Sequence, residues 1–353
     1  MPRKSRKQAE RRAVTERSAA TSGETARLRL WPALAVLLVV VVIVYIPALQ
    51  SGYIWDDENY VTQNETLRSV EGLGRIWFEI GATKQYYPLL FTAWWAQYQL
   101  WEQNPVGYHL INVLLHACTA CLLFFVVRRL CVPGAFVVAA LFALHPVHVE
   151  SVAWVTELKN TLSGVFYMSS LLLYLRYAGL GDGDMATTHR WRFLGGALVF
   201  FLCALLSKTA TCTLPAAIFL LLWWKQKQLS FSNIAPLLPM AVVGVALGLI
   251  TAWVEREVVG AAGDVWALSF LERVLIAGRA LWFYAGKLLW PFHLTCIYEK
   301  WDINDAIGWN YLYPFLSIVP VIVLWRLRRV IGRGPLVAVL IFGGTLLPAL
   351  GFI

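Results

Sequence analysis

The chain has 353 residues, of which 59% are hydrophobic and only 14% are charged, and its formal net charge is +9. A soluble globular protein usually carries about a quarter charged residues, so this composition excludes an ordinary soluble protein and indicates that lipid is the main solvent. The positive charge gathers near the N-terminus, where residues 1–30 are expected to form a disordered cytoplasmic tail beside anionic lipid rather than a nucleic-acid-binding segment. The basic residues of this tail include Arg3, Lys4, Arg6, Lys7, Arg11, Arg12 and Arg17.

Apolar runs after this tail predict an all-α polytopic membrane protein whose transmembrane domain occupies residues 31–353. The first run, residues 31–47, has no cleavage pattern behind it, so we expect a signal anchor that stays in the protein. Together with this anchor, the apolar runs predict a bundle of about nine transmembrane helices. The other runs lie near residues 107–127, 133–145, 160–177, 193–206, 212–224, 235–253, 311–325 and 336–353.

Lys and Arg in the short loops predict which loops face the cytoplasm. These basic marks are Arg128, Arg129, Arg176, Arg190, Arg192, Lys225, Lys227, Arg326, Arg328, Arg329 and Arg333. With the N-terminus in the cytoplasm, the opposite face is predicted to hold four outward segments, residues 50–106, 145–159, 207–211 and 254–310. Because the flanking spans must cross in opposite directions, residues 270–290 are expected to form an interfacial or re-entrant helix. The alternative is that residues 270–290 cross the membrane as an ordinary span. The basic residues would then assign some loops to the wrong side of the membrane.

The first outward segment begins with a pair of adjacent carboxylates, Asp56 and Asp57. Adjacent carboxylates repel each other unless a cation, hydrogen bonds or a substrate hydroxyl compensates. Such a carboxylate at a membrane surface can act as a general base towards an alcohol, whereas capping a short helix is the structural alternative. Behind the pair, residues 67–80 and 89–101 combine apolar residues at helical spacing with many aromatic residues, which predicts interfacial helices.

Two groups of polar residues follow in the next span and loop. His109, Asn112 and His116 fall at i, i+3 and i+7, so they share one helical face, and a hydrogen-bonded structural stripe is favoured over a ligand set. The string from His145 to Glu150 reads HPVHVE and is a weak metal signal. A helix that starts at Pro146 would turn both histidines of the string away from Glu150, whereas an extended strand would align His148 with it.

Basic residues on the outward segments could bind a phosphate. Lys208 lies between hydroxyl residues with no acidic neighbour in sequence, and it suits either a lipid phosphate or snorkelling to the interface. Lys159 and Arg279 are further candidates, and His145 and His148 could donate to a phosphate or a sugar. A carboxylate pair and separate cations on one face are what a lipid-phosphate-linked sugar donor would require. Composition alone leaves a transporter equally credible.

Several strings resemble the transmembrane and tetratricopeptide-repeat O-mannosyltransferase family and its bacterial relatives. They are Trp55-Asp56-Asp57, the GYHLINVLLH run at residues 107–116, the FALHPVHVE run at residues 142–150, Ser207-Lys208 and Leu346-Leu347-Pro348. The resemblance runs from about residue 50 to the C-terminus, and the two longer strings are the specific ones. The run at residues 157–162 looks closer to the bacterial members than to the animal ones.

The resemblance implies a GT-C type membrane glycosyltransferase that moves a sugar, expected to be mannose, from a polyprenyl phosphate to a protein Ser or Thr hydroxyl outside the cytoplasm. It places an acidic residue of the first outward loop, Asp56 or Asp57, at the reaction. It further implies a bacterial inner membrane, undecaprenyl phosphate as the carrier lipid, and a C-terminal repeat domain that this sequence lacks.

The mechanism expected from these residues is an inverting displacement at the anomeric carbon. Asp57 or Asp56 takes the acceptor proton, and Lys208, Lys159 and Arg279 neutralise the departing phosphate. The residues that position donor or acceptor are expected to be His145, His148, Glu150 and His109. No cofactor is required and a divalent metal remains possible. The competing hypotheses are a transporter or assembly scaffold, and a membrane O-acyltransferase that would leave the Asp pair unexplained.

Overall fold

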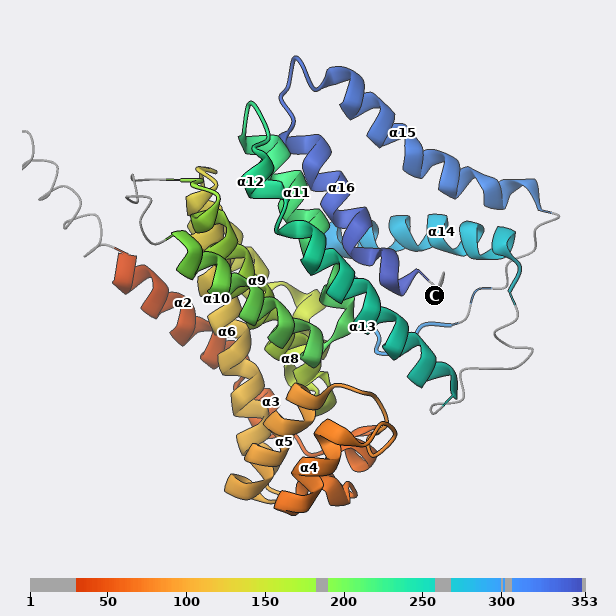
Figure 1. The fold of residues 1–353 in the computed structure, drawn as a ribbon. Coiled ribbons are helices and arrows are strands. Elements are labelled where there is room, and N and C mark those ends of the chain that lie inside the picture. Colours follow the sequence, from red (N-terminus) through yellow and green to blue (C-terminus); the bar gives the residue numbers. More distant parts are fainter. Residues whose placement is uncertain (1–29, 182–189, 258–267, 300, 302–306, 351–353) are drawn as a thin grey trace, which may run out of the picture.

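The computed structural model describes residues 30–181, 190–257, 268–299, 301 and 307–350, and every regular element in these ranges is helical (Figure 1). The predicted basic tail lies outside this part except for Leu30. The α-helices are α2 (Leu30–Val44), α3 (Ile46–Leu49), α4 (Val70–Phe78), α5 (Pro88–Trp101), α6 (Pro105–Arg129), α7 (Ala135–Leu144), α8 (Val149–Ala153), α9 (Leu158–Tyr177), α10 (Arg190–Ser207), α11 (Leu214–Lys225), α12 (Phe231–Ile234), α13 (Leu237–Glu257), α14 (Phe270–Leu289), α15 (Leu312–Leu327) and α16 (Gly334–Leu346). Short helices of other types are η1 (Glu58–Thr62), η2 (Glu65–Leu67), η3 (Pro146–His148), η4 (Val155–Glu157), η6 (Thr209–Thr213), η8 (Gly308–Tyr311) and η9 (Leu347–Ala349).

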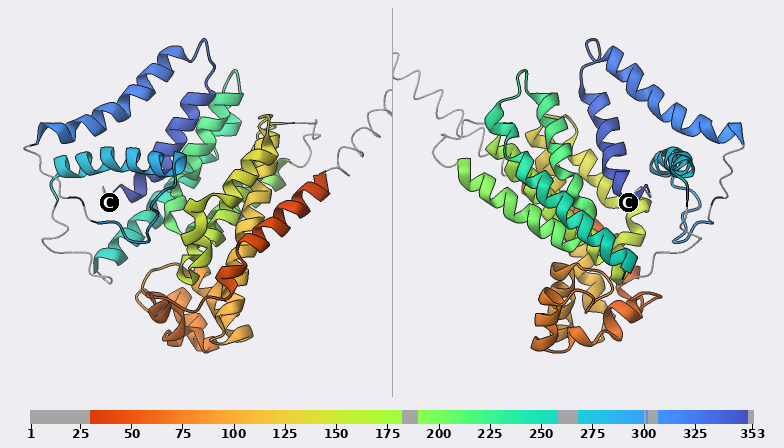
Figure 2. Two further views of the ribbon diagram at one scale, coloured as in Figure 1. Left: turned by 180° about the vertical axis from the view of Figure 1, so that it is seen from behind. Right: turned by 45° about the vertical axis from the view of Figure 1, so that its right-hand side comes forward.

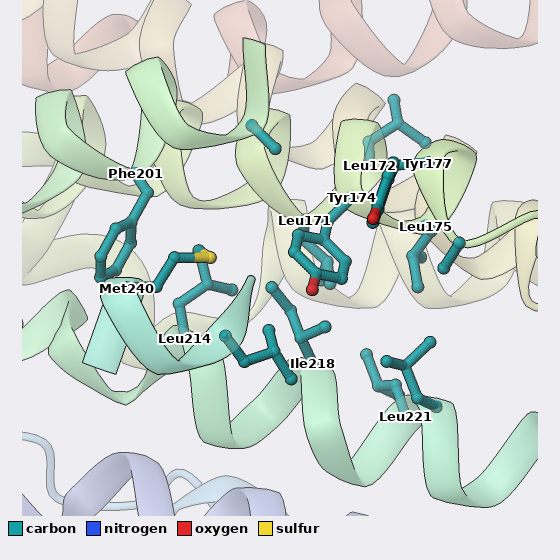
Figure 3. Close-up of a cluster of buried hydrophobic side chains, with 14 of the residues drawn as sticks. Leu171, Leu172, Tyr174, Leu175, Tyr177, Phe201, Leu214, Ile218, Leu221 and Met240 are labelled. Carbon is teal, nitrogen blue, oxygen red and sulfur yellow. The ribbon is translucent and has the colours of Figure 1, made fainter. Parts of the chain in front are cut away.

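The largest core cluster lies where α9, α10, α11 and α13 meet. Figure 3 shows its side chains, among them Tyr174 from α9, Phe201 from α10, Ile218 from α11 and Met240 from α13. The hydroxyl of Tyr174 donates a hydrogen bond to the carbonyl of Asn233 at 2.8 Å, so the buried ring carries no unsatisfied polar group. This packing fixes α9, which carries Lys159, and α10, which ends directly before Lys208.

A second cluster joins α2, α6 and α7 around small side chains. Ala120 on α6 and Ala139 on α7 are fully buried beside Val41 of α2. Small residues let helix backbones approach closely. In a membrane the hydrophobic effect does not drive helices together, so helices associate through such close packing. The predicted anchor therefore packs against the bundle, although its helix is interrupted at Tyr45.

The first outward segment folds into a compact cap of helices at one end of the bundle. Figures 1 and 2 show α4 and α5 side by side there, and they confirm that residues 67–80 and 89–101 are largely helical, while their place at the membrane interface stays a prediction. Ser69 caps α4 by accepting a hydrogen bond from the backbone of Gly72 at 3.0 Å, and Pro88 starts α5. The core of the cap, around the fully buried Trp94, also contains Tyr108 of α6 and Leu158 of α9, so the cap packs directly onto the bundle.

The C-terminal helices make a looser group. Figures 1 and 2 show α14 lying crosswise to α16. α14 begins with a reciprocal capping box between Ser269 and Glu272, and it approaches α15 closely at Gly278, where a Cβ would lie 2.5 Å from the backbone nitrogen of Pro314. A crosswise helix with charged residues along it is compatible with the predicted interfacial helix.

The number of membrane crossings is supported only in part. By length and composition, 4 helices of the described part could cross a membrane: Pro105–Arg129, Arg190–Ser207, Phe231–Val254 and Gly308–Leu327. A fifth arises if the pair Ala135–Leu144 and Pro146–Ala153, bent by 49°, is one span, and the remaining apolar helices Trp31–Val44, Thr209–Lys225 and Gly334–Ala349 are shorter. The structure thus supports an all-α membrane protein, while the bundle of about nine crossings stays a prediction.

Candidate functional site

Segments predicted to face outward meet at one end of the bundle. The first of them reaches the second through Asp57, whose Oδ1 accepts a hydrogen bond from the backbone of Thr156 at 2.8 Å. It also reaches the third, because the hydroxyls of Tyr87 and Thr209 lie 3.3 Å apart. These contacts join residues far apart in sequence, so they confirm that the segments share one end.

The predicted basic marks collect at the other end. Arg190 donates to the hydroxyl of Tyr177 at 3.4 Å, and Arg333 donates to the carbonyl of Trp223 at 2.7 Å. The side chain of Gln226 connects two of these loops by donating a hydrogen bond to the carbonyl of Ala178 at 3.3 Å. The two ends of the bundle therefore differ in charge as the loop composition predicted.

Asp57 is a fully buried carboxylate whose two oxygens are both occupied. Its Oδ2 accepts from the backbone of Ile54 at 2.9 Å, and its Oδ1 accepts from both the backbone and the hydroxyl of Thr156. Its exposed fraction is 0%. A buried carboxylate needs hydrogen-bond donors, because removing one of them leaves a buried oxygen without a partner and lowers the stability of the fold. Asp57 thus fastens the first outward segment to the second.

Asp56 has a different environment from its neighbour. Its side chain is partly exposed, and within the described residues it has no side-chain hydrogen bond and no ion pair. Its backbone carbonyl accepts from the amide of Tyr60 at 3.0 Å, which holds it at the start of η1. A carboxylate that is held by its backbone and open at its side chain can still accept a proton from a ligand. The structure therefore divides a pair that the sequence treats as equivalent.

The short helix η4 connects the Asp pair to the lysines, an arrangement called the η4 junction below. Thr156 binds Asp57, and the next residue, Glu157, forms an ion pair with Lys159 at 2.8 Å. Consecutive residues of one turn thus hold the carboxylate on one side and a cation on the other.

Lys208 joins this junction through Asn160. The Lys208 ammonium donates to Oδ1 of Asn160, while the amide nitrogen of Asn160 donates to Glu157 and, at 3.0 Å, to the hydroxyl of Ser151. The oxygen and the nitrogen of the Asn160 side-chain amide therefore both have hydrogen-bond partners. Lys159 and Lys208, predicted as phosphate ligands, are brought together at one place.

The surroundings of Lys208 destabilise the charged form of its side chain. Burial is the main cause that lowers the pKa of its ammonium, and the like charge of Lys159 lowers it further, whereas Glu157 and Glu150 act in the opposite direction. A cation that has lost its water shell gains more from a phosphate than an exposed lysine does. Lys208 is therefore well suited to hold an anion that enters this site.

The histidines of the HPVHVE string form their own group. The ring of His148 lies 5.3 Å from the ring of His116 and 6.5 Å from that of His145, centre to centre, and Nε2 of His145 lies 3.0 Å from the carbonyl oxygen of Leu288. Glu150 instead interacts electrostatically with Glu157 and the two lysines. Pro146 opens a helix, and the histidines and Glu150 have different neighbours, as the helical alternative predicted. The contact at Leu288 also brings the fourth outward segment to this end.

The polar stripe on α6 is structural for two of its three members. Asn112 donates to the carbonyl of Trp154 at 2.9 Å and accepts from Thr161 at 3.1 Å, and His116 bonds the carbonyl of Ala143 at 3.0 Å. The third, His109, is 1% exposed, and neither ring nitrogen has a hydrogen-bond partner in the described part of the chain. The stripe holds the segment around η4 against α6.

Metal binding finds no support in the described residues, which contain no group of three or more His, Cys, Asp or Glu side chains that could hold an ion. The histidine string supplies two nearby rings, but its carboxylate has other neighbours. The role of a metal stays untested.

Arg279 has aromatic neighbours. Its guanidinium lies 4.5 Å from the ring centre of Trp301 and 5.9 Å from that of Tyr313. Lys287, about two turns further along α14, lies near the rings of Phe283 and Tyr298. The structure therefore shows no contact between Arg279 and the η4 junction, and its role as a phosphate ligand stays a prediction.

Some residues of the site were not among the sequence candidates. Thr156, Asn160 and Ser151 are uncharged, and although Asn160 lies in the run at residues 157–162, none of the three was given a role. Their importance comes from partners 99, 48 and 9 residues away. Only an extended search for polar residues around the lysines would have found them.

Comparison with known proteins gives a consistent set of relatives. The chain is 29% identical over 183 residues to the protein O-mannosyl-transferase Tmtc1 of Drosophila melanogaster, covering 48% of this chain and 20% of the relative. It is similar to protein O-mannosyl-transferases. Human TMTC2 is 29% identical over 44% of this chain and 20% of its own length, and mouse TMTC3 is 31% identical over 40% and 16%. The chain thus spans about a fifth of the length of these relatives. No protein-family model and no solved structure matches the chain.

Proposed function

We propose that this chain is a membrane glycosyltransferase that moves mannose from a polyprenyl-phosphate donor to a protein Ser or Thr hydroxyl on the non-cytoplasmic face. The observation that carries the proposal is the η4 junction, which joins a buried Asp57 to Lys159 and Lys208 within one end of the bundle. The similarity to proteins named protein O-mannosyl-transferases supports the sugar and the protein acceptor. We infer from both that the chain belongs to that family, with a GT-C-like membrane domain.

In the proposed reaction, the oxygen of the acceptor hydroxyl attacks the anomeric carbon of the sugar. Asp56 accepts the proton that this hydroxyl loses. The bond between that carbon and the phosphate oxygen breaks, and the electron pair leaves with the polyprenyl phosphate, so the anomeric configuration inverts. Asp57 positions its neighbour, because its own oxygens are occupied by Ile54 and Thr156.

The leaving phosphate gains negative charge as the bond breaks. Lys208 and Lys159 lie at the η4 junction, where a preorganised cation stabilises developing charge without having to reorient. Glu150 interacts electrostatically with this junction, and it is proposed to position donor or acceptor together with the His145–His148 pair. The proposal also includes a bacterial inner membrane and undecaprenyl phosphate, which the resemblance implies, and a cytoplasmic N-terminus, which the Lys and Arg of the short loops predict.

The proposal is tested with membranes that contain the chain and a labelled polyprenyl-phosphate mannose, by counting label in protein or peptide. Asp56→Asn removes the base, so transfer should fall at least about 100-fold while the amount of protein is unchanged. Glu65→Gln, which changes an exposed carboxylate of the same segment, should leave transfer intact. Wild-type membranes that transfer no label, or an Asp56→Asn variant within a few-fold of wild type, would refute the proposal or the role of Asp56, respectively.

A further inference from the structure

An exposed tryptophan stands directly before the proposed base. Trp55 is 63% exposed, although a large aromatic side chain at the start of a compact segment could have been buried in the core of the cap. Its backbone has a φ of +43°, a left-handed conformation that is unusual for a bulky residue and is costly to hold. The residue is thus kept in an unfavourable conformation with its ring outside.

Trp154 supports this ring from one side. The two indoles stack with their centres 5.7 Å apart and an angle of 13° between their planes. Trp154 is itself buried, and its carbonyl is held by Asn112 from α6 at 2.9 Å. Because Trp154 directly precedes η4, the support of the stack is fixed to the same turn that holds Asp57 and Lys159.

The buried indole has a polar group with no partner. Nε1 of Trp154 finds no hydrogen-bond acceptor among the described residues, and burying an N–H without an acceptor opposes folding. Neither the strained Trp55 nor the unsatisfied Trp154 is explained by stability. The exposed and strained ring of Trp55 is explained if its outer face serves a ligand, with the buried indole of Trp154 as its support.

We propose that the stacked indoles of Trp55 and Trp154 form a platform for the hexose ring of the donor, next to Asp56. The C–H bonds on one face of a pyranose are slightly positive and the face of an indole is negative, so the flat faces attract each other. A ring placed on Trp55 would lie beside the side chain of the adjacent residue, Asp56, where the incoming hydroxyl loses its proton. This inference rests on the proposed function, because it assigns the sugar subsite of that reaction.

The test compares two lipids that differ only in the sugar, polyprenyl-phosphate mannose and the same polyprenyl phosphate without mannose, binding to the detergent-purified full chain. Trp55→Gly removes the ring and suits the positive φ, so it does not strain the backbone. It should weaken binding of the mannose-bearing lipid about tenfold and leave binding of the sugar-free lipid unchanged. Trp55→Phe should recover most of the loss. Trp309→Ala, which removes a tryptophan that is 67% exposed elsewhere, should change neither.

Equal weakening of both lipids would show that Trp55 contacts the lipid chain or holds the fold, and would overturn the platform. So would unchanged binding of both, or a rise in KM for the acceptor peptide with no rise for the donor. The transfer assay separates the two proposals. Mannose transfer that is insensitive to Trp55→Gly removes the platform alone, whereas sugar-dependent binding without any transfer keeps the platform and removes the proposed function.

Discussion

Two regions of the molecule hold pairs of cations, and they hold them by different means. At the η4 junction, Lys159 and Lys208 contact a carboxylate and an amide that are themselves saturated. On α14, Arg279 lies over aromatic rings. Lys287 combines ring contacts with hydrogen bonds that its ammonium donates to the carbonyls of Phe292 and His293. The sequence makes Lys159, Lys208 and Arg279 alike candidates for a phosphate ligand.

The difference concerns what the protein does with the charge. Hydrogen bonds that a lysine donates to an amide oxygen or a carboxylate fix it in position, so its charge is oriented before a ligand arrives. Rings attract a cation less directionally and by about 0.5–1 kcal/mol at exposed sites. The junction is therefore suited to catalysis, and the α14 region to anchoring a helix among aromatic neighbours.

Lys208→Met should have the largest effect, because it removes a buried cation from the junction without shortening the side chain much. We expect kcat/KM for the donor to fall about 100-fold, which corresponds to about 2.7 kcal/mol of transition-state stabilisation. Labelled-mannose transfer in membranes measures it, and Lys84→Met, at an exposed lysine of the first outward segment, serves as the control. A loss below about fivefold, smaller than one charge-assisted hydrogen bond provides, would contradict the role given to Lys208.

The pH dependence of transfer should report the same lysine. Lys208 carries its charge below its pKa, and burial lowers that pKa from the usual lysine value. Transfer should therefore be lost as the pH rises, by up to about tenfold per pH unit above the pKa of Lys208, and earlier than an ordinary lysine titrates. Lys208→Arg should move this fall to higher pH, because an arginine stays charged. Superimposable profiles for the two proteins would exclude Lys208 as the titrating group.

Gly278→Ala tests the α14 region by its packing. A Cβ there would meet the backbone nitrogen of Pro314 at 2.5 Å, whereas a Cβ at Gly286, on the same helix, has nothing within 4 Å. We expect Gly278→Ala to lower the free energy of unfolding by about 1–3 kcal/mol, and Gly286→Ala to raise it slightly through helix propensity. Thermal unfolding of the detergent-solubilised chain measures both. Equal stability of the two variants would mean that α14 and α15 do not rely on this approach.

Arg279→Met should have the smallest effect on transfer. If the guanidinium only stabilises its ring contacts, kcat/KM should change about two- to fivefold, the size expected of a cation–π interaction. The same transfer assay measures it beside Lys208→Met. A loss as large as that of Lys208→Met would instead restore Arg279 to the phosphate site and remove the distinction between the two regions.

The sequence predicted the parts of this structure that depend on local pattern. Spacing on α6 placed His109, Asn112 and His116 on one face, and two of them are hydrogen-bonded as a stripe. Lys and Arg in the short loops predicted which segments meet at each end, because membrane insertion acts on each loop separately.

The remaining features depend on contacts between distant residues. Nothing near Asp57 in sequence indicates that it is the buried member of the pair, because its partner Thr156 is 99 residues away. Asn160 likewise becomes a ligand of Lys208 only when α9 and α10 pack together. The number of crossings was harder to predict for another reason, since several apolar helices are shorter than a bilayer requires and the bend after α7 interrupts another.

The single turn η4 also acts as a spacer of fixed length. Thr156 and Glu157 are consecutive residues, so the distance between the carboxylate side and the ammonium side of the site is set by about one residue of backbone. In the proposed reaction the phosphate oxygen is bonded directly to the anomeric carbon whatever the sugar, so the required spacing is the same for every glycosyl donor. Inserting or deleting a residue in this turn should therefore impair transfer of any sugar rather than change which sugar is transferred.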